Sequence, residues 1–87
     1  MTADEYNSMC RATGFDRKKV KRHKYVAYRN YSCVVLNSPA YFTWIKLYEQ
    51  GYAEISDWLE TTCYFTVTEK GIEYIERQEN CKIQVEA

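Results

Sequence analysis

The residues with the clearest chemical character form a basic run in the first third of the chain. Seven cations fall between positions 17 and 29, and Tyr25, Tyr28 and Tyr31 stand among or beside them. Lysine and arginine side chains neutralise phosphates, and tyrosine rings stack on bases or contact sugars. The run therefore predicts a nucleic-acid contact, although a solvated surface face accounts for the same composition equally well. The seven cations are Arg17, Lys18, Lys19, Lys21, Arg22, Lys24 and Arg29.

The other polar residues offer little for catalysis. His23 is the only histidine and lies inside the basic run, where a solvated surface position is favoured over a role as general base. The three glycines stand singly at positions 14, 51 and 71, so the chain has no glycine-rich phosphate loop. We therefore expect a protein that is not an enzyme and that needs no cofactor.

The four cysteines, at positions 10, 33, 63 and 81, do not form a metal motif. No pair has the C-x-x-C spacing of a zinc ribbon or a redox site, and a single histidine is too few for a mixed-ligand site. We expect reduced thiols that behave as small buried hydrophobes, with no bound metal. Spacing alone does not choose a pairing if disulfides form.

The charge is distributed unevenly along the chain, although the net charge is zero. Residues 1–30 hold eight of the twelve Lys and Arg and three of the twelve acidic residues, which gives +5; residues 31–87 hold the rest, which gives −5. Such asymmetry suits an anionic partner for the first part, or two halves that face each other.

Length and hydropathy point to one domain outside membranes. We assign residues 1–87 to a single domain, whose small core is supplied by aromatic residues that make up 16% of the chain. The polar, acidic beginning is unlike a secretory signal, and the longest uncharged stretch, 30–45, is too short to span a bilayer. We expect a cytoplasmic location and no membrane partner.

Residues 38–50 carry the strongest helix signals in the chain. Ser38 suits the N-cap and Pro39 suits the first helical position. Apolar residues then recur at helical spacing, and Gly51 predicts a left-handed end to the helix. The expected inward residues are Tyr41, Trp44, Ile45 and Tyr48, and the expected outward residues are Thr43, Lys46 and Gln50.

Residues 52–67 change to β-branched and aromatic side chains on both sides of a polar break at Glu60-Thr61. This pattern predicts two strands joined by a turn. A second helix is expected from Thr68 to about residue 80, with Ile72 and Ile75 turned inward. Gly71, which has no side chain, would allow another segment to pack closely against the first turn of this helix.

This order of parts resembles the second half of winged-helix domains. In that family a helix ending in Leu-x-x-x-Gly leads into a β-wing, and the returning strand runs into a Thr-Glu-Lys-Gly helix start; residues 47–51 and 68–71 match these phrases. The likeness covers roughly half of the chain. The resemblance implies that the 39–50 helix reads nucleic acid through Thr43, Lys46 and Gln50. Residues 22–31, together with the same half, also resemble short bacteriophage proteins of mostly unassigned function.

The first half has a helix and a strand region in place of the helices that precede the wing in that family. Thr2 and Glu5 are spaced for a capping box, and Gly14 is placed to end the first helix. Residues 15–24 are a charged connector, extended or mobile unless an acidic surface or an anion holds it. Residues 25–36 fit one bent strand or two short strands, and residues 81–87 can add an edge strand beside them. The strand faces expected from alternation are Val26, Tyr28 and Val34 on one side, and Tyr25, Tyr31 and Cys33 on the other.

A second kind of partner is suggested by the predicted hairpin turn. Trp58 and Leu59 are large apolar residues beside that turn, where they either fold back on the core or meet a partner. Glu54, Asp57 and Glu60 make the same hairpin acidic. These five residues predict, as an alternative to nucleic acid, an inhibitor that binds a basic surface on a host defence or nucleic-acid-processing protein.

Together these patterns predict a small α+β domain of winged-helix-like order: helix, strand region, helix, β-hairpin, helix and an optional last strand. The leading function is a non-catalytic phage or mobile-element protein that contacts nucleic acid in the host cytoplasm. The sequence leaves open DNA or RNA as the target, its sequence preference, and the oligomeric state, with a homodimer among the options.

Overall fold

The computed structural model describes residues 1–86 as a chain of alternating helical and extended segments. Within that range there are three α-helices, one 3-10 helix and five strands. In chain order they are α1 (Ala3–Thr13), the 3-10 helix η1 (Arg17–Lys19), β1 (Lys24–Ala27), β2 (Ser32–Val35), α2 (Pro39–Glu49), β3 (Ala53–Trp58), β4 (Thr62–Val67), α3 (Glu69–Glu79) and β5 (Lys82–Val85). The expected α+β class is confirmed.

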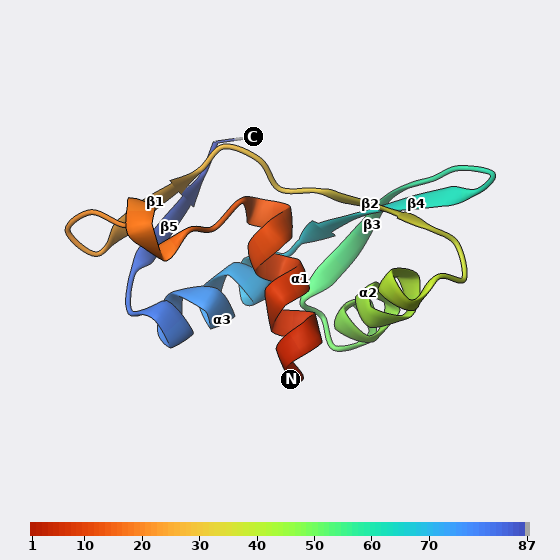
Figure 1. The fold of residues 1–87 in the computed structure, drawn as a ribbon, viewed down its shortest axis with the longest axis horizontal. Coiled ribbons are helices and arrows are strands. Elements are labelled where there is room, and N and C mark those ends of the chain that lie inside the picture. Colours follow the sequence, from red (N-terminus) through yellow and green to blue (C-terminus); the bar gives the residue numbers. More distant parts are fainter. Residues whose placement is uncertain (87) are drawn as a thin grey trace.

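The strands form two separate sheets. β2, β4 and β3 make a three-stranded antiparallel sheet with β4 in the centre, and β1 pairs with β5 in parallel. The molecule measures 42 × 24 × 19 Å. Figure 1 shows the β1–β5 pair at one end of the long axis, the β3–β4 turn at the other, and α1 crossing the middle.

The strand region of the first half is thus two short strands, one in each sheet. Asn30 lies between them, and its side chain donates to the carbonyl oxygen of Val67 (2.9 Å) and accepts from the Val67 N–H (2.8 Å). The expected edge strand at the C-terminal end is confirmed, because β5 pairs with β1 from Lys24–Lys82 to Ala27–Val85.

The alternation predicted within each strand is confirmed, but the predicted grouping of Val26 with Val34 and of Tyr25 with Cys33 was wrong. Tyr25 and Ala27 are buried in β1 while Val26 is half exposed, and in β2 Val34 is buried while Cys33 is exposed. Residues 28–31 leave the extended pattern, so the alternation of one strand does not continue into the next. Each strand therefore buries its own set of side chains.

The main core lies between the helices and one face of the three-stranded sheet. Trp44 of α2 stacks on Phe65 of β4, with ring centroids 5.5 Å apart and planes at 17°. Met9, Leu47 and Ile75 join them from α1, α2 and α3. Burial of these large side chains supplies most of the hydrophobic stabilisation available to so short a chain.

The helix ends follow the sequence signals closely. Both halves of the Thr2–Glu5 capping box are formed, and Ser38 and Thr68 each accept a backbone N–H as N-caps of α2 and α3. Gly51 has a φ of +84°, and the Tyr52 N–H donates to the Leu47 carbonyl at 2.9 Å. This confirms the left-handed end expected for α2.

The inward face of α2 differs from the expectation in one residue pair. Leu47 is fully buried, whereas Tyr48 is 47% exposed. The buried stripe runs through Trp44 and Leu47, three residues apart, and Tyr48 lies about 100° further around the helix. The predicted core role of Tyr48 was therefore wrong, and Leu47 occupies that position.

Candidate nucleic-acid interface

The basic segment, residues 17–24, folds into one turn of 3-10 helix followed by a tight reversal. Lys21 and Lys24 exchange both backbone hydrogen bonds, each at 2.9 Å, around Arg22 and His23. These two central residues have φ angles of +52° and +61°, as in the two-residue turns that match the twist of a hairpin. The reversal is the extreme left end of the molecule in Figure 1.

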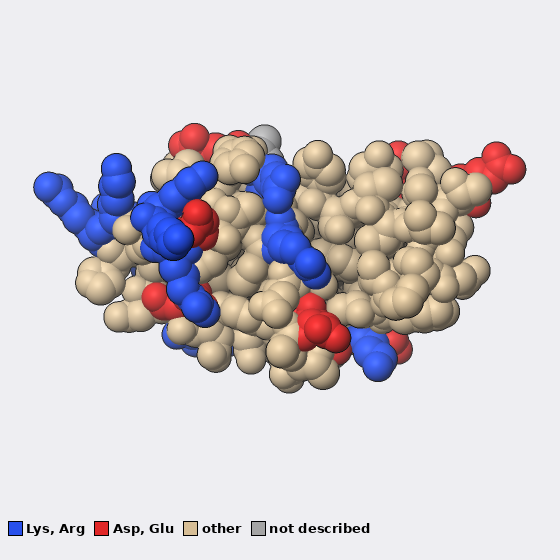
Figure 2. Space-filling view, viewed as in Figure 1, with Lys and Arg blue, Asp and Glu red and all other residues tan. Residues whose placement is uncertain are grey.

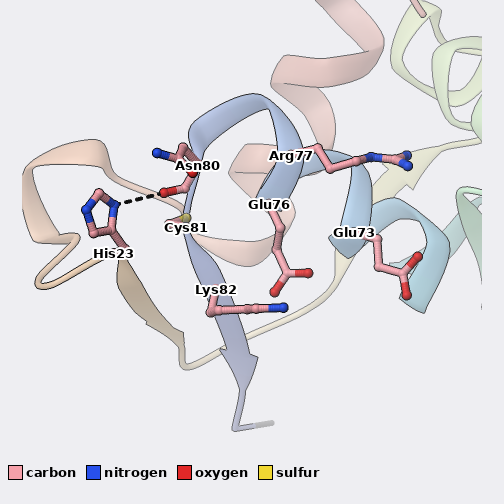
Figure 3. A pocket seen from close by; sticks show the side chains of 7 residues that line it. All are labelled: His23, Glu73, Glu76, Arg77, Asn80, Cys81 and Lys82. Carbon is pink, nitrogen blue, oxygen red and sulfur yellow. Dashed lines mark hydrogen bonds between the residues drawn. The ribbon is translucent and has the colours of Figure 1, made fainter.

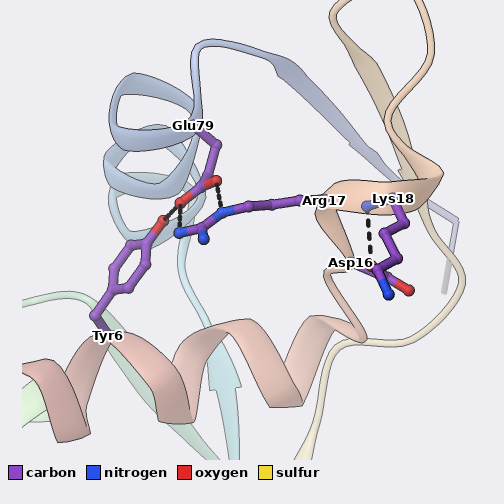
Figure 4. A network of polar contacts seen from close by, with 5 residues as sticks. All are labelled: Tyr6, Asp16, Arg17, Lys18 and Glu79. Carbon is purple, nitrogen blue, oxygen red and sulfur yellow. Dashed lines mark hydrogen bonds and ion pairs between the residues drawn. The ribbon is translucent and has the colours of Figure 1, made fainter.

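One cation of the segment is neutralised inside the protein. The Arg17 guanidinium donates two hydrogen bonds to the carboxylate of Glu79 in α3, one from Nε to Oε1 and one from Nη2 to Oε2, the second at 2.9 Å (Figure 4). The Tyr6 hydroxyl also donates to Oε2 of Glu79, at 2.6 Å. The hydrogen bonds from Arg17 hold the pKa of Glu79 below its usual value, whereas burial raises the pKa of Tyr6. An acidic side chain thus holds the connector at its first basic residue.

The remaining cations of the segment face solvent. Arg17–Glu79 is the only side-chain ion pair among residues 1–86, so the others have no carboxylate partner in that range. Asp16 is near but its carboxylate accepts from the Lys18 backbone N–H, at 2.9 Å. Figure 2 shows the resulting cluster of basic side chains at the β1 end of the molecule. The exposed cations are Lys18, Lys19, Lys21, Arg22 and Lys24.

Lys82 joins this end of the molecule through the parallel strand pair. It lies opposite Lys24 in the register of β1 and β5, and it is exposed. The sequence reasoning missed Lys82, Glu79 and Tyr6 as parts of this site. No local signal links them to the basic segment, because pairing across the fold brings them there.

Arg29 and the tyrosines lie apart from the exposed cluster. Arg29 is in the middle of the chain path between the sheets, and its Nη2 donates to the Arg11 carbonyl at 2.7 Å. Tyr28 and Tyr31 are more than half exposed, but Tyr25 is buried and its hydroxyl donates to the Gly14 carbonyl. Two of the three rings expected to contact nucleic acid are therefore accessible.

The residues expected to read bases from α2 are not beside the basic segment. α2 lies in the opposite half of the molecule (Figure 1). The Thr43 hydroxyl donates to the Pro39 carbonyl at 3.1 Å, and the Gln50 amide donates to the Lys46 carbonyl at 2.8 Å. Lys46 itself is exposed. The structure therefore separates the two groups of predicted contacts.

The hairpin residues of the alternative site are close together and exposed. Trp58 is 55% exposed and Leu59 48% exposed, and the Trp58 ring makes an edge contact with Tyr41, at 6.4 Å between centroids. Glu54, Asp57 and Glu60 are also exposed, and acidic side chains mark the hairpin tip in Figure 2. This end of the molecule is apolar and acidic, opposite in character to the β1 end.

A hollow of about 600 Å³ lies between α3 and the β1–β5 pair (Figure 3). The charged residues that line it are of both signs. The Glu76 carboxylate accepts from the Ile83 N–H at 2.7 Å, and the His23 Nδ1 lies 3.1 Å from the Asn80 carbonyl oxygen. In the part of the chain that the structure describes, no three His, Cys, Asp or Glu residues are grouped to hold a metal ion.

No family model matches the chain, and neither does any curated protein or solved structure. The likeness to winged-helix domains and to phage proteins thus stays a prediction. None of the helices within residues 1–86 has the length and apolar character required to cross a bilayer.

Proposed function

We propose that the protein is a non-catalytic binding protein that contacts nucleic acid through its basic end. The observation that carries this proposal is the gathering of Lys18, Lys19, Lys21, Arg22 and Lys24 at one end of the molecule without carboxylate partners among the described residues. Clustered, unpaired cations release counterions when they meet a phosphate backbone, which favours binding.

The backbone of the turn supports the same proposal. Arg22 and His23 occupy the left-handed region, where glycine or asparagine is usual and other residues cost roughly 1–3 kcal/mol each. Glycine or asparagine would form the same reversal with less backbone strain. A turn that keeps a cation at its tip despite that cost is consistent with selection for charge at this place.

The basic end is the part of the predicted interface that the geometry favours. α2 lies in the other half, so base reading by Thr43, Lys46 and Gln50 would require a second contact region. Phosphate contacts alone give affinity without sequence preference. A phage or mobile-element origin is proposed because residues 22–31, together with the helix–hairpin–helix half of the chain, resemble short bacteriophage proteins.

A matched pair of charge reversals tests the proposal. K19E/R22E removes two exposed cations from the basic end, and K70E/R77E makes the same change in net charge on α3. Binding to a labelled duplex and a labelled single strand is measured by fluorescence anisotropy across a salt series, with the fold of each variant checked by circular dichroism. We expect K19E/R22E to weaken both complexes by at least about tenfold and to flatten the salt dependence. Wild-type affinity for K19E/R22E would refute the proposal.

A second candidate function is favoured by the exposure of Trp58 and Leu59 at the acidic hairpin. Large exposed aromatic residues are frequent anchors of protein interfaces, and the surrounding carboxylates would suit a basic partner. We propose a protein-binding inhibitor as the alternative. Affinity capture from nuclease-treated bacterial lysate with wild type and W58A tests it: equal recovery of every captured protein would rule out Trp58 as an anchor.

A further inference from the structure

An open groove at mid-length of the molecule is separate from the basic end, because none of residues 17–24 lines it. It lies between the C-terminal part of α1, residues 29–34 and the start of α2, and it holds about 530 Å³. Arg11 and Arg29 are the charged residues of its lining, and the lining has no carboxylate among the described residues. Its polar and aromatic members include Ser8, Tyr31, Ser32 and Cys33.

The two arginines place positive charge at one side of the groove. Arg29 uses one N–H to cap the carbonyl of Arg11, at 2.7 Å, which leaves most of its guanidinium donors unused. Arg11 is exposed in the last turn of α1. Two arginines in a lining that holds no carboxylate among the described residues are suited to a phosphate group.

A pair of aromatic rings lies next to these cations. Tyr31 is 54% exposed, and its ring is 6.4 Å from that of Tyr64, with the planes tilted by 34°. The Tyr31 N–H donates to the Ala12 carbonyl at 3.2 Å, and the neighbouring Asn30 is fixed to Val67 by two hydrogen bonds. The backbone that carries the Tyr31 ring is therefore held in place before any ligand arrives.

We propose that this groove holds one nucleotide of a single strand, with its phosphate on Arg11 and Arg29 and its base against the ring of Tyr31, which lines the groove. The inference rests on the proposed nucleic-acid function and deepens it by naming a single-stranded target. A base within a duplex is stacked on its neighbours and cannot lie on a protein ring, whereas an unpaired base can.

The groove and the basic end are close enough for one short strand. Lys24 and Arg29 are five residues apart, which is at most about 18 Å of extended chain. Exposed Tyr28 lies between them along the chain. Figure 2 shows basic side chains both at the β1 end and at mid-length on the same face of the molecule.

The test compares two substitutions in the groove with two matched controls. Y31L and R29Q remove the ring and the charge, and Y48L on α2 and K70Q on α3 make comparable changes at exposed residues outside the groove. The probes are a fluorescein-labelled thymidine oligomer of about twelve nucleotides and a duplex of equal length. We expect wild type to prefer the single strand, and Y31L to lose roughly 5- to 100-fold of single-strand affinity with less than a twofold change for the duplex. R29Q should weaken single-strand binding by about fivefold, and the controls should match wild type.

The outcomes separate this inference from the function on which it rests. If K19E/R22E lowers binding of both probes while Y31L and R29Q lower neither, the groove inference is refuted and the basic-end proposal stands. If thymidine monophosphate competes as well as the oligomer at equal concentration, the site is one for a free nucleotide and the single-strand inference is wrong. Photo-crosslinking of a bromouracil oligomer gives a measurement independent of affinity: adducts at Tyr31 or Tyr64 support the inference, and adducts confined to other residues overturn it.

Discussion

The two ends of this molecule differ in what holds them together. The end built from α2 and the three-stranded sheet has fully buried Trp44, Leu47 and Phe65 at its centre. The basic end has a smaller buried group, with Tyr25 and Ala27 of β1, and depends in addition on the β1–β5 pairing and on the contacts of Glu79 with Arg17 and Tyr6. Burial of large apolar groups stabilises far more than an exposed ion pair does. The comparison suggests that stability and binding are supplied by different regions.

The largest predicted effect concerns the core of the α2 end. Phe65→Ala should lower the free energy of unfolding by about 3–5 kcal/mol, because it leaves a cavity beneath Trp44. Phe42→Ala, at a residue 51% exposed on the same end, should cost less than about 1 kcal/mol. Urea denaturation measures both. Equal losses in the free energy of unfolding for the two variants would show that the buried cluster around Trp44 and Phe65 is not the main source of stability.

The second-largest effect is expected where α3 packs closely against α1 and the three-stranded sheet, at Gly71. A Cβ added at Gly71 would lie 2.5 Å from Val67 Cγ1 and 2.6 Å from the Tyr52 carbonyl oxygen, which is backbone and cannot easily move. Gly71→Ala should therefore destabilise by about 1–3 kcal/mol in thermal denaturation. Glu73→Ala, exposed on the same helix, serves as the control and should change stability by less than about 0.5 kcal/mol.

A smaller effect is expected at the basic end. Glu79→Gln removes the charged partner of Arg17, and because Arg17 is mostly exposed the loss should be about 1 kcal/mol. The pKa of Glu79 is lowered in the folded state, so its contribution is complete above the unfolded pKa and is lost as the pH falls through the folded value. Wild type should therefore lose more stability than E79Q between about pH 5 and pH 3. Parallel pH profiles for the two proteins would contradict this assignment.

The smallest effect on stability is expected at the hairpin tip. Trp58→Ala should lower the free energy of unfolding by less than about 1 kcal/mol, since the ring is more than half exposed and meets Tyr41 only at its edge. A loss of several kcal/mol would place Trp58 in the core and remove the reason for proposing it as a protein anchor. Chemical denaturation followed by circular dichroism avoids relying on the fluorescence of the substituted residue.

Sequence reasoning succeeded where local signals decide the structure. Ser38, Thr68 and the Thr2–Glu5 pair each bond within three residues of themselves, and the left-handed Gly51 ends its own helix. The β3–β4 hairpin is also local, because its strands are joined by a short turn. Propensity and spacing are sufficient for such features.

The parts that depend on distant contacts could not be predicted in the same way. Residues 25–36 contain no signal that β1 will join β5 while β2 joins β4, and this division reverses which side chains are buried. Arg17 and Glu79 are 62 positions apart, so their pairing is set by the position of α3. The groove between Arg11, Arg29 and Tyr31 likewise exists only after α1 has packed beside residues 29–34.

The parallel pairing of β1 with β5 also bears on the order of folding. Residues 24 and 82 meet in this pair, so closing it closes a loop that includes β2, α2, β3, β4 and α3. Contacts of such long sequence separation form late, since their entropic cost is offset only after the intervening chain is compact. During synthesis the basic turn therefore gains its strand partner only after β5 has left the ribosome.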